Sequence, residues 1–251
     1  MRIASLGSGS KGNATLVQSG DTTLLVDNGF SLRKFTQRLE RFEIDPGSID
    51  ALLLTHEHGD HSGGVERLCV AHSIPLWTAV GTARAALSPQ FKYGRLVVGQ
   101  SITIGDIEVL PVTVPHDANE PLQFIFHQID IGKRLGILTD TGHITPHIVD
   151  SFSCLDALLL EFNYDAEMLQ RGPYPEMLKQ RVGGNHGHLS NDQSLDLLQR
   201  IDTSSLNCLI AAHISEKNNS AEIVDALIRQ LDAVPAPVLA NQEVGFDWIW
   251  I

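Results

Sequence analysis

The sequence predicts an α/β protein in which helices cover both outer faces of a sandwich of two β-sheets. Three observations lead to this fold class. Short apolar strands alternate with amphipathic helical segments, no linker or low-complexity tract interrupts them, and 43% of the 251 side chains are apolar. A chain of this length and composition can bury one large core or two closely packed halves, so we expect a single domain over residues 1–251.

The first half of the chain is predicted to begin with three strands, separated by Gly, Ser and Asn turns, at residues 2–6, 14–18 and 22–27. An amphipathic pattern then predicts a helix from Ser31 to about Phe42. The next predicted elements are a strand at Ala51–Leu54, a helix at Val65–His72, a strand near Leu76–Trp77, a helix near Thr82–Leu87 and several strands between about 95 and 138.

The second half is predicted to alternate strands with helices in the same way. A strand at Leu158–Leu160 is followed by several helices, one of which begins at Ser190 or Asn191. The remaining predicted elements are a strand at Leu206–Ala211, a helix at Ala221–Leu231 and a last strand near Pro237–Leu239.

A dense group of metal-ligand side chains follows the strand at Ala51–Leu54. His56, His58 and His61 lie within six positions, together with Glu57 and Asp60. As the strand ends in a loop, His56 and His58 can both turn toward one ion, while the turn carries Asp60 and His61 toward a second. Imidazole and carboxylate suit zinc, manganese or ferrous iron, and the absence of cysteine favours an open catalytic site over a closed structural zinc site. The alternative is a His-rich surface loop without metal.

Three further apolar strands also end in residues of ligand type, which are His116, Asp140 and His213. Taken singly, each is more often a turn former or a satisfied polar end of a strand. Four strand ends of the same kind in one chain instead predict that these side chains converge at one edge of the sheets. The sequence therefore predicts a two-metal site.

Composition restricts the setting of this chemistry. The net charge of −12 opposes non-specific attraction to nucleic acid, although two bound cations would place positive charge where a scissile phosphate needs it. The three cysteines form no CxxC pair and fit reduced thiols in the cytosol. The N-terminal segment turns glycine-rich before any signal-type apolar stretch, and no apolar run is long enough to cross a bilayer. We expect a cytoplasmic protein without a membrane segment.

At this point the sequence resembles the metallo-beta-lactamase fold superfamily, whose signature is HxHxDH followed by a distant His, Asp and His. More narrowly it is similar to the bacterial YycJ-like (WalJ) branch, implicated as 5′-to-3′ exonucleases that act on DNA. The segments that carry the narrower resemblance are Leu6–Asn13, Val26–Gly29, Gly187–Asn191 and His213–Asn219. The resemblance implies an αββα sandwich of two mixed sheets.

The resemblance also implies a ligand set for two divalent ions, zinc or manganese, with iron as a further option. His56, His58 and His116 would hold one ion, Asp60, His61 and His213 the other, and Asp140 would bridge both. Two dications exceed the charge of two ligand carboxylates, so they could hold a bridging hydroxide as nucleophile and still attract an anionic substrate. Diiron flavoproteins of this fold carry glutamate at the place of His58, so the histidine favours hydrolysis over redox chemistry.

A second pair of residues is similar to the Glu–His pair of transfer-RNA 3′-processing phosphodiesterases of this superfamily. Glu161 follows the strand at Leu158–Leu160, and His188 precedes a predicted helix. His188 would protonate the leaving oxygen of a phosphodiester, and Glu161 would orient it. His188 could instead only cap the helix, and His186 is the alternative acid.

Five other residues have candidate roles around the site. Asp27 is expected to fix a ligand histidine or a loop, or else to form an Asx turn. Lys11 and the glycines around it could contact phosphate oxygens as a wall of the site. Arg171, Lys179 and Arg181 could follow a phosphate backbone, or they are ordinary solvated charges on a helix.

The favoured function is a metal-dependent phosphodiesterase, specifically a 5′-to-3′ DNA exonuclease, with RNA as a second possible substrate. The 72 residues from 141 to 212 already accommodate two strands and several helices, so we expect no clamp domain of the kind that larger nucleases of the superfamily insert there. One alternative is a glyoxalase II-like thioester or ester hydrolase, which needs no acid for a thiolate leaving group. The other is a non-catalytic metal-binding regulatory protein.

Overall fold

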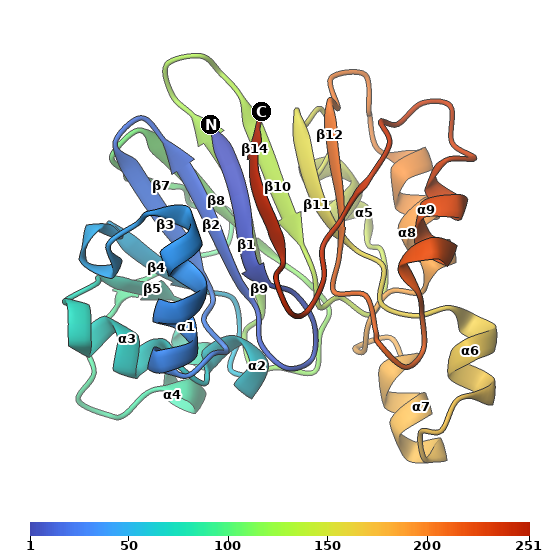
Figure 1. Cartoon of the computed structure of the whole chain (residues 1–251), viewed down its shortest axis with the longest axis horizontal. Helices are drawn as coiled ribbons and strands as arrows, with labels where there is room; N and C mark the ends of the chain where they lie inside the picture. The colour runs from blue at the N-terminus through green and yellow to red at the C-terminus, as the bar shows by residue number, and fades with distance from the viewer.

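The computed structural model describes residues 1–251 and contains two seven-stranded sheets packed face to face (Figure 1). The first sheet has the order β14-β1-β2-β3-β4-β5-β6, with strands β1 Arg2–Gly7, β2 Ala14–Ser19, β3 Thr22–Val26, β4 Ala51–Leu54, β5 Leu76–Thr78, β6 Gly94–Arg95 and β14 Phe246–Trp250. The second has the order β13-β12-β11-β10-β9-β8-β7, with strands β7 Ile102–Ile104, β8 Ile107–Thr113, β9 Leu122–Gln128, β10 Arg134–Leu138, β11 Ala157–Glu161, β12 Cys208–Ala212 and β13 Val238–Leu239.

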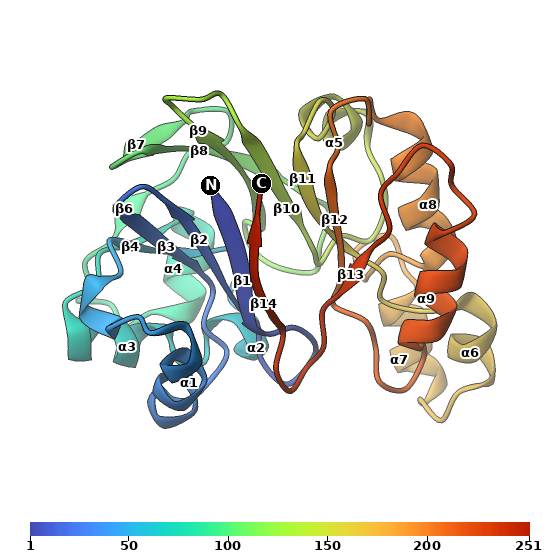
Figure 2. The same cartoon turned by 45° about the horizontal axis from the view of Figure 1, so that its top comes forward.

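Helices cover both outer faces of this sandwich (Figure 2). The helices on the side of the first sheet are α1 Leu32–Leu39, α2 Gly59–Ser62, α3 Val65–His72 and α4 Val80–Ala86. The second sheet is covered by α5 Pro146–Ser151, α8 Asn191–Arg200 and α9 Ala221–Ile228, while α6 Ala166–Arg171 and α7 Glu176–Val182 project beyond its edge (Figure 1). None of the helices combines the length and apolar character needed to cross a membrane.

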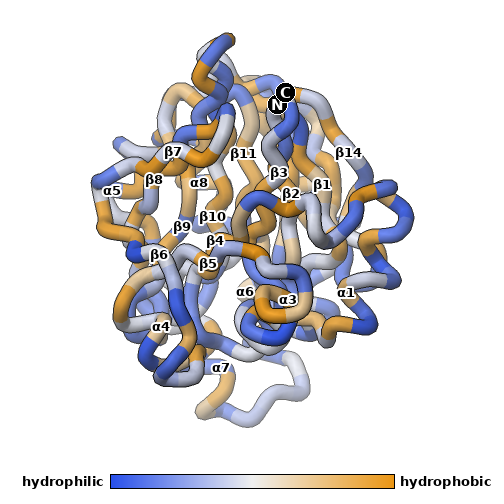
Figure 3. The backbone as a smooth tube through the Cα atoms, turned by 90° about the vertical axis from the view of Figure 1, so that its left-hand side faces the viewer, coloured by the Kyte–Doolittle hydropathy of each residue, from blue (hydrophilic) through white to orange (hydrophobic).

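Three layers of buried apolar side chains hold the sandwich together. One cluster of 22 residues fills the space between the sheets, one of 17 lies between the first sheet and α1 and α3, and one of 19 lies between the second sheet and α5, α8 and α9. The sequence of strand β4 is apolar throughout because both of its faces are buried. Leu53 faces the other sheet, and Leu52 and Leu54 face the helices. Figure 3 shows the apolar colour concentrated in the strands.

Both sheets are mixed, as predicted. Strands β3 to β6 run parallel and β1 to β3 antiparallel in the first sheet, while β10 to β13 run parallel and β7 to β10 antiparallel in the second. In such sheets, crevices outside the carboxyl ends of the strands are the usual ligand sites. The predicted ligands follow the carboxyl ends of β4, β8, β10 and β12.

The structure differs from the sequence prediction at several elements, among them the edge of the first sheet and the helix after Ser31. The strand near Pro237–Leu239 is not the last, because β14 follows it and pairs antiparallel with β1 at the edge of the first sheet. The aromatic and β-branched residues of β14 are the signal for this strand, and the Arg2 guanidinium lies 4.1 Å from the ring centroid of Trp248. The predicted helix from Ser31 ends as an α-helix at Leu39 and continues as a 3-10 turn to Phe42.

Candidate metal centre

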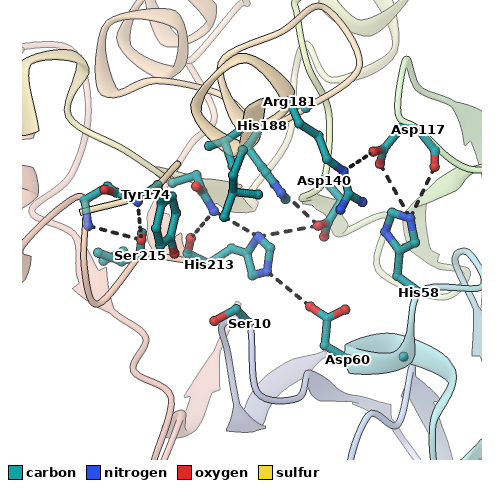
Figure 4. A pocket seen from close by; sticks show the side chains of 17 residues that line it. Ser10, His58, Asp60, Asp117, Asp140, Tyr174, Arg181, His188, His213 and Ser215 are labelled. Atoms are coloured by element: carbon teal, nitrogen blue, oxygen red, sulfur yellow. Dashed lines mark hydrogen bonds and ion pairs between the residues drawn. The ribbon is translucent and has the colours of Figure 1, made fainter. Parts of the chain in front are cut away.

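The predicted ligand residues meet in a cavity of about 380 Å³ at the carboxyl ends of the strands (Figure 4). The cavity lies between loops of both sheets and helix α7. Residues of ligand or acid–base type that line it are His58, Asp60, Asp117, Asp140, His188 and His213. His56, His61 and His116 lie behind them and are at most 5% exposed.

The first group, which we call the three-histidine group, consists of His56, His58 and His116, whose ring nitrogens lie within 4.8 Å of one another. His116 Nδ1 is 2.9 Å from the carbonyl oxygen of Gly187, which can only accept, so this nitrogen donates and Nε2 keeps a free lone pair. His116 Nε2 is 3.2 Å and His56 Nε2 3.1 Å from His58 Nδ1. Burial lowers the pKa of His116, and it lowers that of His56 well below the ordinary value. Neutral imidazoles of this kind are metal ligands.

The second group, which we call the aspartate group, consists of Asp60, His61 and His213. His61 Nε2 is 3.6 Å and His213 Nε2 3.9 Å from Asp60 Oδ2. Burial lowers the pKa of His61, but the carboxylates of Asp140 and Asp27 outweigh this and raise it to about 9. Burial likewise opposes protonation of His213, and Asp140 nevertheless raises its pKa well above the ordinary value. Without a cation, these carboxylates therefore hold protons on the two imidazoles.

Asp140 lies between the two groups and is 2% exposed. Its carboxylate oxygens are 3.3 Å from His61 Nε2 and 4.0 Å from His116 Nε2. Burial raises its pKa, but the imidazoles around it, His213 first, hold it well below the ordinary value, so Asp140 is ionised. The structure thus brings the seven predicted residues together at one cavity.

Two atoms of this centre indicate that its residues fit a metal ion. Asp140 Oδ2 and His213 Nε2 are both buried and have no hydrogen-bond partner. A buried polar atom without a partner is costly, and a cation coordinated by these atoms would remove that cost. Imidazole and carboxylate donors without cysteine also match the ligand chemistry of a catalytic zinc or manganese site.

Asp27 positions one histidine of each group. Its Oδ2 accepts a hydrogen bond from His61 Nδ1 at 2.7 Å and one from the Thr55 hydroxyl at 2.8 Å. Because the hydroxyl proton goes to Asp27, Thr55 Oγ1 accepts from His56 Nδ1 at 2.9 Å. Each histidine therefore carries a proton on Nδ1 and turns Nε2 toward the centre, which agrees with the predicted role of Asp27.

The chain bends sharply at three of these residues. Asp27, Asp140 and His213 have φ angles of 60°, 50° and 54°, and they are three of the six non-glycine residues with positive φ. Each lies one or two residues after the end of a buried strand. Asp and His tolerate this left-handed conformation better than most residues, and it aims their side chains across the sheet edge.

The loop that was predicted after β4 contains a one-turn helix, α2, because the amides of His61 and Ser62 both donate to the carbonyl of His58. The glycine-rich and Val-Asp-Asn-Gly segments hold this turn in place. Asn13 N donates to the Asp60 carbonyl at 2.8 Å, and a Cβ at Gly29 would overlap that same carbonyl. These motifs therefore fix the backbone that carries Asp60 and His61.

Glu161 and His188 form the expected pair. Glu161 is 0% exposed, and its Oε1 is 2.8 Å from both His188 Nδ1 and His213 Nδ1. Burial raises its pKa, but the nearby His188 and His213 outweigh this and lower it to about 2, so the carboxylate accepts both hydrogen bonds. His186 is exposed and does not contact Glu161, so the structure brings His188 and not His186 to the carboxylate.

The two C-terminal motifs are joined to each other behind the site. The side-chain amides of Asn191 and Asn219 exchange two hydrogen bonds of 2.8 and 3.1 Å, and both residues are buried. Asn219 also donates to the carbonyl of Phe162 at 2.8 Å. This pairing fixes the loop of His188 relative to the loop of His213.

Of the basic residues predicted to lie near the chemistry, only Arg181 lines the cavity, where its Nε donates to Asp117 Oδ2 at 2.6 Å. Arg171 pairs with Glu167 on the surface of α6, and Lys179 Nζ donates to the Gln170 carbonyl at 2.5 Å. Lys11 does not line the cavity. It forms an exposed ion pair of 2.6 Å with Glu216, and its neighbour Ser10 lines the cavity instead.

Several residues of the site were not predicted from the sequence. Asn163 donates to the His213 carbonyl at 3.0 Å, Asp117 lies 3.5 Å from both His58 Nε2 and His116 Nε2, and Tyr174 forms part of the cavity wall. Asp117 had a usable signal, because it directly follows His116 at a strand end. Tyr174 had none, because its place depends on how α6 and α7 pack.

The chain matches the family model of the beta-lactamase superfamily domain over residues 22–214. It belongs to the metallo-beta-lactamase superfamily. It is 32% identical to the exodeoxyribonuclease WalJ of Streptococcus pneumoniae over 97% of this chain and 90% of WalJ, and 30% identical to the exodeoxyribonuclease YycJ of Bacillus anthracis over 92% of this chain and 89% of YycJ. A solved metallo-beta-lactamase fold protein, YhfI from Bacillus subtilis, shares the fold with a TM-score of 0.75 at 14% identity, over 99% of both chains.

Membership of the metallo-beta-lactamase superfamily confirms three predictions from the sequence. These are the family with its YycJ-like (WalJ) branch, the αββα fold, and the class of metal-dependent hydrolases. It also agrees with the binding of divalent metal, for which the clustered His and Asp side chains provide the ligands.

Proposed function

We propose that this protein is a phosphodiesterase that degrades DNA from the 5′ end, with RNA as a second substrate to be tested. The observation that carries the proposal is His188, which lines the cavity and is held by the buried Glu161 beside both ligand groups. An alkoxide leaving group needs a proton, whereas a thiolate does not, so a positioned acid favours phosphodiesters over thioesters. The relatives named exodeoxyribonuclease support the same substrate class.

We propose that the centre holds two divalent ions, zinc or manganese. His56, His58 and His116 would hold one, Asp60, His61 and His213 the other, and Asp140 would contact both. When bound, such ions lower the pKa of coordinated water and neutralise the charge of a phosphate. The unpartnered Asp140 Oδ2 and His213 Nε2 support this assignment.

The chain's own residues supply positioning and proton transfer. Glu161 accepts from Nδ1 of His188, which leaves Nε2 as the atom that holds a proton for the departing oxygen. Arg181 is the cation of the cavity wall, and its exposed ion pair with Asp117 can open to meet a phosphate oxygen. His58, Asp60 and His188 all line the cavity, so the substrate phosphate would enter beside these three residues.

We further propose that the chain works as a single domain without a clamp domain, so that loops and α7 provide the grip on nucleic acid. The segment between Asp140 and His213 forms only α5, β11, α6, α7, α8 and β12, which supports this. A cytoplasmic location is part of the proposal, because all three cysteines are free thiols, as expected in a reducing compartment.

The test is to incubate protein loaded separately with manganese and zinc with four substrates. These are 5′-phosphorylated duplex DNA, single-stranded DNA, RNA and a glutathione thioester. We expect release of mononucleotides from the 5′ end of DNA and no hydrolysis of the thioester. Thioester hydrolysis without DNA cleavage would replace the proposal with a glyoxalase II-like activity, and metal binding without any cleavage would indicate a regulatory protein.

A further inference from the structure

Helix α7 carries apolar side chains that belong to none of the three cores. None of its residues is fully buried, although Leu178 and Val182 are half-buried. These two residues are four positions apart, so they share one face of the helix, and both line the cavity. Tyr174, a further four positions upstream, lines the cavity as well. The three side chains form an apolar wall, which we call the Tyr174 wall.

The backbone of Tyr174 is restricted by a proline on each side. It lies between Pro173 and Pro175 in the short connection from α6 to α7. Proline fixes its own φ angle and restricts the residue before it to extended conformations, so the backbone that carries this ring loses little further freedom when a ligand binds. The ring forms no aromatic pair within the protein, and its one cationic contact is Lys217 Nζ, 5.5 Å from the centroid.

The two sides of the cavity therefore differ in the kind of residue that lines them. Figure 4 shows Asp117 and His58 at one side and Tyr174 with Ser215 at the other, with His188 and His213 between them. Ser215 Oγ accepts from the amides of Asn218 at 3.2 Å and Lys217 at 3.4 Å, which leaves its own hydroxyl proton for an acceptor in the cavity. A ligand that fits must combine an anionic group at the ligand residues with a flat apolar group at the wall.

We propose that the Tyr174 wall stacks against the base of a nucleotide next to the scissile phosphodiester. This inference rests on the proposed function, because it requires a nucleic acid in the cavity. Every base has a π face, so stacking on an aromatic ring grips any sequence, and Lys217 would face the adjoining phosphate. An acyl chain would pack against Leu178 and Val182, but only a flat ring stacks on Tyr174, and only a nucleotide brings a phosphate to Lys217, so the observations favour a base.

The test compares wild type with Tyr174→Ala on a 5′-phosphorylated oligonucleotide. Matched substrates carry a tetrahydrofuran abasic nucleotide at the first or the second position. With an intact end, Tyr174→Ala should lower kcat/KM by roughly 5- to 100-fold, mainly through KM, because base stacking on an aromatic residue contributes on this scale. At one of the two abasic positions, the variant and wild type should differ by less than about twofold, because the stacking partner is gone.

Three controls separate stacking from damage to the fold. Tyr174→Phe keeps the ring and should retain wild-type rates, whereas Tyr174→Leu should resemble the alanine variant. Met177→Ala changes a side chain of the same hairpin that is 84% exposed and does not line the cavity, and it should have no effect. Equal losses on intact and both abasic ends, or no loss with Tyr174→Ala, would overturn the inference while DNA cleavage by wild type still upheld the proposed function. If wild type cleaves no DNA, both proposals fail together.

Discussion

The three-histidine group and the aspartate group lie in one cavity wall but differ in electrostatics. Burial keeps the imidazoles of His56 and His116 neutral, and no carboxylate outweighs it there. In the aspartate group, carboxylates reverse the effect of the same burial and raise the pKa of His61 to about 9. Side chains of one residue type therefore differ in protonation according to which carboxylates the fold places beside them.

The difference follows from where each strand end lies. His116 follows β8 and is bonded to a backbone carbonyl, whereas His61 and His213 are bonded to the buried carboxylates Asp27 and Glu161. A backbone carbonyl orients an imidazole without adding charge, but a carboxylate both orients it and favours its protonated form. The first group is thus ready for a cation at neutral pH, while the second must exchange protons for it.

Replacing the residue between the groups should have the largest effect. Asp140→Asn keeps the shape of the side chain but removes the negative charge that lies near both groups. We expect DNA cleavage to fall on the order of a thousandfold or more, together with a lower metal content measured by elemental analysis. Asp150→Asn, at an exposed position of α5, is the matched control. Full activity with normal metal content would remove Asp140 from the centre.

Removal of the proposed acid should separate chemistry from metal binding. His188→Ala should slow cleavage of unactivated phosphodiesters by roughly a hundredfold or more, because the leaving oxygen loses its proton donor. Its metal content should stay normal, since His213 keeps its bond to Glu161. The control is His186→Ala, which changes an exposed histidine two residues away and should leave the rate unchanged. A slow His186 variant beside a normal His188 variant would reverse the two assignments.

The fold was predictable from the sequence because its strands are buried on both faces. A short, continuous apolar run such as Ala51–Leu54 indicates a strand that is buried on both faces of a sandwich. The polar residues that follow it mark the edge of the sheet. Strand β14 was missed although its tryptophans favour a strand, because it contains Asp247 and is an edge strand. An edge strand is only partly buried, so its pattern depends on what packs beside it.

Some features of the candidate site could be predicted from the sequence, and others became visible only in the structure. Four of the ligands lie close together in the sequence, so their convergence follows from local geometry; they are His56, His58, Asp60 and His61. Helix α2 could not be predicted, because it is a single turn held by tertiary contacts of Asn13 and Gly29. The double role of Glu161 was also hidden, since it depends on the loop before α8, which carries His188, and the end of β12, which precedes His213, both reaching the end of β11.

Asp27 offers a way to weaken both groups through one residue that binds no cation. Asp27→Asn retains a hydrogen-bonding side chain but removes the charge that holds His61 directly and His56 through Thr55. We expect metal affinity to fall roughly 10- to 100-fold, as for other residues that orient metal ligands. Competition with a chelator measures this, with Asp21→Asn in the exposed β2–β3 turn as control. A loss confined to one of two binding steps would mean that Thr55 does not relay the effect.

The smallest expected effect is on the stability of the metal-free protein, and it tests the comparison directly. The folded-state pKa of His61 is raised to about 9, so its protonated form stabilises the fold fully below the ordinary pKa, and this contribution is lost as pH rises toward 9. The pKa of His56 and His116 is lowered, so they reduce stability as pH falls below the ordinary value. The two groups should therefore give opposite slopes on the two sides of neutrality.

Thermal unfolding of metal-free protein between about pH 5 and 9.5 should thus show a maximum near neutrality, with a fall of a few degrees on either side. His61→Gln should reduce the alkaline fall to the part that His213 contributes and leave the acid side in place. His147→Gln, at an exposed position, should change neither side. Bound metal replaces the protons of the aspartate group, so the alkaline fall should disappear in loaded protein. An alkaline fall as large in His61→Gln as in wild type would show that the carboxylates do not act through this imidazole.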